Sequence, residues 1–167
     1  MVMHHHVRTH SSSPSGGSVA RLRVVPVDTV DSWQLYLVQV AHHLRHTVGN
    51  DPDALLTLTQ PPHIANWVHP PIGNTFLAEA FLASMVEYGF SDEDATAIYL
   101  TFFTRILGVL CAQTATSAPS AANPTLIDGT AYPTLARLSP LLNLGWDSSD
   151  FDAALDDIIT SLERDLH

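Results

Sequence analysis

The fold is decided by residues 92–116, which read DEDATAIYLTFFTRILGVLCAQTAT. Three acidic side chains open this stretch, where the positive end of a helix dipole favours them. The apolar side chains that follow occupy nearly the whole circumference of the predicted helix, whereas an amphipathic surface helix needs only one apolar stripe. We therefore expect this helix to be covered on several sides, with part of the cover coming from a second chain.

The C-terminal stretch has the clearest periodicity in the chain. Ser149 is the expected N-cap of a final helix. Its apolar residues recur at helical spacing on one face; they are Phe151, Leu155, Ile158, Ile159, Leu162 and Leu166. A single apolar seam of this kind packs against a partner.

A first helix is expected from Trp33 to Val48. Asp31 and Gln34 have the spacing of a capping box, and apolar residues then recur every three or four positions. Gly49 ends the periodic pattern, because glycine favours the end of a helix over its interior.

Two more helices precede the long one. Asp51 and Pro52 form an N-cap followed by a proline at the first helical position, which opens a short helix. Another helix is expected over residues 74–88, with Phe76 on its apolar side. Gly89 is a helix C-cap, so the chain turns sharply there into the long helix.

The rest of the chain adds one short helix and no sheet. Residues 132–142 predict a helix interrupted by Pro140, and no alternating run is long enough for strands. Residues 1–18 combine histidines with Ser, Pro and Gly and resemble a tag-like, disordered lead. We expect one all-α domain over residues 19–167, a bundle of six to eight helices.

Charge excludes one class of function for this chain alone. It carries 17 acidic residues and seven basic ones, for a formal net charge of −10. A duplex-binding surface needs clustered cations, and here the arginines are scattered, so the chain should repel DNA. An acidic cluster near the C-terminus is expected to be a solvated helix face rather than a cation site.

The remaining compositional signals favour a cytoplasmic protein without a membrane segment. No run of about 18 uninterrupted apolar residues exists, and the N-terminus lacks the pattern of a secretory signal. The single cysteine, Cys111, lies in an apolar helical run, where a buried and inert thiol is expected.

The order of these elements resembles the C-terminal regulatory domain of the tetracycline-repressor (TetR/AcrR) family of transcriptional regulators. The resemblance covers residues 31–166. It rests on Trp33 at the start of the first helix, on the joint EYGFSDEDA at residues 87–95, and on the tail, AYPTLARL at 131–138 followed by FDAALDDIITSLERDL at 151–166.

The resemblance implies a homodimer. In this family the last long pair of helices packs against its copy as a four-helix bundle, and here these helices would be residues 92–116 and 149–166. The predicted interface consists of Phe102, Ile106, Leu110, Phe151, Leu155, Ile158, Ile159 and Leu162. The family reads DNA through a preceding helix-turn-helix domain, which residues 1–30 cannot form, so that domain is expected to be absent from this chain.

The resemblance also implies a cavity for a small apolar effector. The proline-bracketed segment 61–71 contains Trp67 between two histidines, and ligand pockets are mostly apolar with a few placed polar groups. The predicted lining is Leu37, Leu58, His63, Trp67, Tyr99 and Phe103. The alternative for these residues is that the aromatic ones are plain core and the histidines are exposed.

Two other functions stay open. One is a helical dimerisation module without a ligand. The other is a metal-assisted enzyme, because His42 and His46 are four residues apart, as in zinc sites built on one helix. No glutamate occupies position 43 and no third ligand is evident, so we expect solvent-facing histidines, no cofactor and no catalysis.

Overall fold

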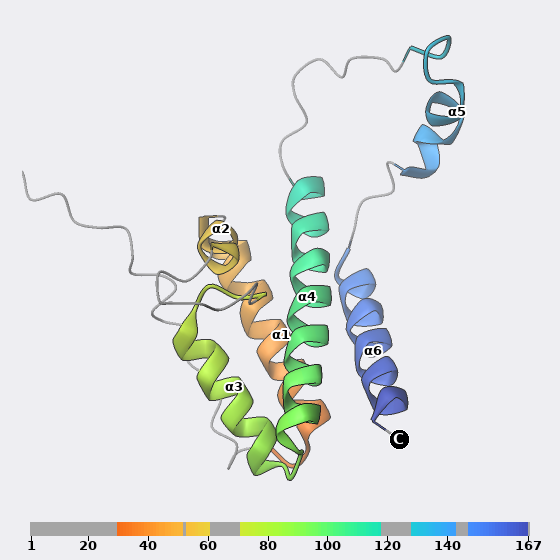
Figure 1. The fold of residues 1–167 in the computed structure, drawn as a ribbon. Helices are drawn as coiled ribbons and strands as arrows, with labels where there is room; N and C mark the ends of the chain where they lie inside the picture. The colour runs from red at the N-terminus through yellow and green to blue at the C-terminus, as the bar shows by residue number, and fades with distance from the viewer. Residues whose placement is uncertain (1–29, 52, 61–70, 118–127, 143–146, 167) are drawn as a thin grey trace, which may run out of the picture.

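The computed structural model describes residues 30–51, 53–60, 71–117, 128–142 and 147–166, and over these residues the chain is all-helical, without strands (Figure 1). The six helices are α1 (Trp33–Asn50), α2 (Asp53–Thr59), α3 (Thr75–Glu87), α4 (Asp92–Ser117), α5 (Pro133–Leu142) and α6 (Ser148–Asp165). The all-α prediction is confirmed. The predictions for the lead 1–18 and for His63 and Trp67 concern residues outside the described ranges.

The long helix α4 is the centre of the fold. Helices α3, α6, α1 and α2 all pack against it, and α1 also contacts α2 and α6 (Figure 1). Its fully buried side chains lie on successive turns and include Ile98, Phe102, Phe103 and Ile106. The expectation that α4 is covered on several sides is confirmed, and the cover comes from four helices of the same chain.

An aromatic cluster joins α3 to α4 and α1. The ring of Phe81 lies 4.8 Å from that of Phe103, 5.6 Å from that of Phe102, 5.8 Å from that of Tyr36 and 5.9 Å from that of Tyr99. Aromatic pairs at such separations add about 0.5–1.5 kcal/mol each beyond the area that they bury. Phe81 is therefore the side chain through which three helices meet.

Capping side chains fix the ends of the helices, and two predicted caps are wrong by one or two residues. Ser32, not Asp31, caps α1, because its hydroxyl accepts a hydrogen bond from the backbone N–H of Leu35. Asp147, not Ser149, caps α6. In both places the chain offers several capping residues in a row, and the pattern of residue types alone cannot choose among them.

The joint between α3 and α4 agrees with its prediction. Gly89 has a φ of 94°, a left-handed conformation that glycine adopts at little cost. The Phe90 N–H donates to the Met85 carbonyl, which satisfies an end carbonyl of α3. Ser91 accepts a hydrogen bond from the Asp94 N–H and so begins α4 at once. The corner is therefore built by local hydrogen bonds.

Three other sequence predictions are wrong. Phe76 does not belong to the apolar side of α3, since it is 72% exposed. Cys111 is exposed rather than buried, because α4 turns this position away from the helices that cover it. Pro140 does not interrupt α5, which continues to Leu142 with the proline inside it.

Helix α5 lies apart from the bundle formed by the other helices (Figure 1). Three of its apolar side chains, or those next to it, are exposed: Tyr132, Leu135 and Leu141. By length and composition alone, α4 would also pass for a membrane span over Asp92–Ala115. In the bundle, 44% of that apolar window is buried.

Replacing Phe81 by alanine should destabilise the chain by about 3–5 kcal/mol, because truncating a buried aromatic side chain removes its contacts and leaves a cavity. Chemical denaturation followed by circular dichroism measures the change. The matched control is Phe76→Ala on the same helix, which should change stability by less than about 1 kcal/mol. Equal losses for the two variants would contradict the position assigned to Phe81.

Candidate functional site

Four of the six predicted ligand-lining residues lie together in the interior. Leu37, Leu58, Tyr99 and Phe103 belong to one buried cluster and come from α1, α2 and α4. The rings of Tyr99 and Phe103 are 5.2 Å apart. The other two predicted residues, His63 and Trp67, are outside the described ranges, so the described part of this site is an apolar wall with one phenol.

The eight residues predicted for the dimer interface are all buried within the single chain. Phe102, Ile106 and Phe151 have no exposed area, and Ile159, the most exposed of the eight, retains 9%. Helices α1, α4 and α6 cover these side chains by packing on one another. The apolar seam is therefore buried without a second chain. The argument that this seam needs a partner to cover it, which placed these side chains in an interface, is wrong.

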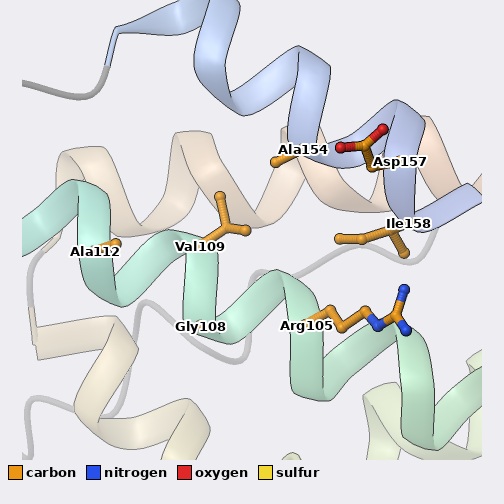
Figure 2. Close-up of a pocket in the computed structure, with 7 residues that line it drawn as sticks. All are labelled: Arg105, Gly108, Val109, Ala112, Ala154, Asp157 and Ile158. Carbon is orange, nitrogen blue, oxygen red and sulfur yellow. The ribbon is translucent and has the colours of Figure 1, made fainter.

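The outer side of the α4–α6 pair carries a groove of about 450 Å³ (Figure 2). Its walls come from these two helices alone. The residues that line it are Arg105, Gly108, Val109, Ala112, Ala154, Asp157 and Ile158. Five of the seven are small or β-branched, so few long side chains fill the groove.

Gly108 is an unexpected residue in this groove. A glycine inside a helix costs roughly 0.5–1 kcal/mol relative to alanine. Nothing in the single chain requires it, because a Cβ built at this position meets no atom within 4 Å. The open space beside Gly108 would allow another helix to approach α4 closely, as small residues do at helix–helix contacts.

Polar side chains join α1 to α6 at both ends of their contact. His42 Nε2 lies 3.6 Å from the Asp152 carboxylate, and the Arg45 guanidinium is 4.6 Å from the centre of the Phe151 ring. At the other end, the Gln34 amide donates a hydrogen bond of 2.9 Å to Glu163. These half-exposed contacts orient α6 on α1 and contribute little stability, as surface ion pairs do.

The histidines on α1 do not form a metal site with other described residues. His42 and His46 are exposed, as the sequence predicts, and His46 lies within hydrogen-bonding distance of Asn50. Among the described residues no three His, Cys, Asp or Glu side chains come together in a geometry that could hold a metal ion.

Three buried polar atoms in the described residues have no hydrogen-bond partner. They are the hydroxyls of Tyr36 and Tyr99 and Nε2 of His43. Burial raises the pKa of both phenols, an effect that the nearby Ser84 hydroxyl partly offsets for Tyr36 and the Ile72 backbone for Tyr99. A buried polar group left without a partner costs about 1–3 kcal/mol, so each of these atoms is an exception that needs a reason.

The sequence did not indicate Tyr36, His43 or Gly108 as functional residues. Tyr36 lies at the spacing of the core residues of α1, His43 looks like one of several surface histidines, and Gly108 is a lone glycine in an apolar run. Only the positions of their neighbours distinguish them, and no local pattern carries that information.

Comparisons of the chain with protein-family models, with curated proteins and with solved structures find no match. A function can therefore be inferred only from the interior cluster, from the groove on α4 and α6, and from the sequence resemblance.

The free energy of unfolding of the chain should decrease in weak acid, because His43 is hard to protonate in the folded state. Burial first, and then the neighbouring His46, lower the pKa of His43 below its ordinary 6.5. Below pH 6.5, the unfolded state therefore binds more protons at this histidine than the folded state does. The stability that is present above pH 6.5 is lost as the pH falls below it. Chemical denaturation at about pH 7.5 and about pH 5.5 measures the change. The free energy of unfolding should decrease less between these two pH values for His43→Gln than for the wild type.

His42→Gln is the control for this measurement, since His42 is exposed and its replacement should retain the acid loss. A loss in His43→Gln as large as that of the wild type would show that other groups carry the effect.

Proposed function

We propose that this chain is the effector-binding and dimerisation domain of a transcriptional repressor of the tetracycline-repressor type. In this proposal, a small, mostly apolar molecule binds among α1–α4, and two chains associate through α4 and α6. Contact with DNA belongs to a helix-turn-helix domain outside the described residues. The acidic net charge of −10 supports this division, because the chain itself repels DNA.

The groove on α4 and α6 is the observation that carries the proposal. It lies on the two helices that pair in the family's dimers, and Gly108 within it is a helix-destabilising residue for which the single chain has no use. Arg105 from α4 and Asp157 from α6 both line it (Figure 2). A surface that offers one charge of each sign can pair with its own copy about a two-fold axis.

The effector site is supported by the interior of the same bundle. Leu37, Leu58, Tyr99 and Phe103 bring apolar and aromatic groups from three helices into one cluster. Binding sites for small molecules are mostly apolar and contain few polar groups. The Tyr36 and Tyr99 hydroxyls supply the few polar atoms that such a site contains.

The oligomeric state tests the dimer directly. The wild-type chain should sediment at twice the monomer mass of 18.2 kDa. Ala154→Arg places a long charged side chain in the groove and should give a folded monomer, because an unpaired charge buried in an interface is strongly unfavourable. Circular dichroism shows whether the variant is folded.

Two further variants sharpen this test. Ala153→Arg changes the neighbouring, exposed position outside the groove and should leave the dimer intact. Gly108→Leu should weaken the dimer without unfolding the chain, since the single chain has room for a side chain there. A wild-type monomer, or a dimer that tolerates Ala154→Arg and Gly108→Leu, would contradict the proposed interface.

A further inference from the structure

The groove on α4 and α6 has a charged end and an end of small residues (Figure 2). Arg105 from α4 and Asp157 from α6 lie at the charged end. The two helices run antiparallel (Figure 1). One turn along α4 leads from Arg105 to Gly108, and one turn in the same direction along α6 leads from Asp157 back to Ala154. Each helix therefore presents a charged residue and then a small one, in the same order along the groove.

The two charged groups of the groove are not paired within the chain. In the part of the chain that the structure describes, the one ion pair joins His42 to Asp152, and it involves neither Arg105 nor Asp157. Both of these side chains are exposed. Each of them can therefore bind a group of opposite charge on a second chain.

The two helices of the groove differ in charge. Beyond its acidic first turn, α4 carries Arg105 as its only charged residue. Helix α6 carries one basic residue, Arg164, and its acidic residues are Asp150, Asp152, Asp156, Asp157, Glu163 and Asp165. At the level of the groove, α4 is thus the basic helix and α6 the acidic one.

Two symmetric arrangements align the helices of two copies on this face. If the two-fold axis lies across the helices, each helix meets its own copy, and Arg105 meets either the partner's Arg105 or an uncharged stretch of α4. If the axis runs along the helices, each α4 meets the partner's α6 at the same level. Opposite charges then meet twice, because a symmetric contact occurs once on each side of the axis. Like charges opposite one another disfavour the first arrangement.

The small residues of the groove fit the second arrangement as well. When Arg105 lies opposite the partner's Asp157, Gly108 lies opposite the partner's Ala154, since both are one turn away in the same direction. Helix axes approach each other more closely where the side chains at the contact are small. Gly108 and Ala154 therefore allow α4 and the partner's α6 to come close enough for the charged groups to meet.

We propose that each α4 of the dimer packs on the partner's α6, and that Arg105 forms an ion pair with the partner's Asp157 on each side of the two-fold axis. The inference rests on the proposed function and specifies how the two copies meet at the same site. A chain that presented the wrong charge at either position would be rejected, so these two residues determine which partner the groove accepts.

Charge reversal tests the pairing in the full chain, with the dimer dissociation constant measured by analytical ultracentrifugation. Arg105→Asp and Asp157→Arg should each raise this constant about 10-fold or more, because each variant places like charges opposite one another twice. The variant with both reversals should dimerise like the wild type, since its charges are only exchanged between the two helices. If each helix met its own copy instead, the single reversals would leave the constant unchanged, which would overturn the inference.

A mixture of the two single variants separates pairing between chains from pairing within one chain. Arg105→Asp and Asp157→Arg chains should form a heterodimer when mixed, because every reversed charge then faces an opposite charge. Native mass spectrometry identifies it by mass. Rescue in the double variant without rescue in the mixture would reveal an ion pair within one chain and would overturn the inference.

Asp156→Arg and Arg137→Asp are the matched controls. They make the same changes of charge at exposed positions outside the groove, and both should dimerise like the wild type. Equal weakening in these controls would assign the effect to net charge and count against the inference. Circular dichroism should show every variant folded, because all four positions are exposed.

The oligomeric state of the wild type separates the inference from the proposed function. A wild-type chain that stays monomeric would contradict the proposed dimer, and the inference with it. A wild-type dimer that Ala154→Arg disrupts, but that tolerates Arg105→Asp and Asp157→Arg, would overturn the inference alone and leave the groove as the interface.

Discussion

The structure depends on one constraint, which is that α4 is apolar almost all the way round. A helix of 26 residues with such a surface has to be covered on several sides. The chain meets this constraint by packing α3, α6, α1 and α2 on it, and the aromatic ring of Phe81 is the point at which three of these helices meet. What α4 leaves uncovered is a stripe along its length that includes Ala97, Leu100, Gly108 and Cys111. The groove around Gly108 is one part of this stripe.

The two candidate sites are therefore two sides of the same helix. Tyr99 and Phe103 face the aromatic interior, while Arg105 and Gly108 face the outer groove. Packed helices move as units rather than deforming gradually, so a ligand that shifts α4 from inside would also shift the surface that it presents outside. In the proposed function, this shared helix is the physical link between effector binding and the geometry of the dimer.

The sequence predicted the helices well, because their boundaries and faces depend on local chemistry. The spacing of Phe151, Leu155 and Ile158 identified the buried face of α6, and Gly89 identified the corner between α3 and α4. It was less informative about what covers each face. Burial by the same chain and burial by a second chain produce the same periodicity, so the apolar seam of α6 was assigned to a partner although α1 and α4 cover it. The exposure of Cys111, likewise, depends on neighbours that no local pattern specifies.

The central claim is that two chains meet through the outer face of α4 and α6, and the chain's single cysteine allows a direct measurement. Cys111 is exposed on α4, so a spin label attached there reports the distance between two copies by pulsed electron paramagnetic resonance. A dimer built on this face should give one narrow inter-chain distance of no more than about three helix diameters, roughly 30–36 Å. A signal without dipolar modulation, or a distance well beyond that range, would contradict the claim.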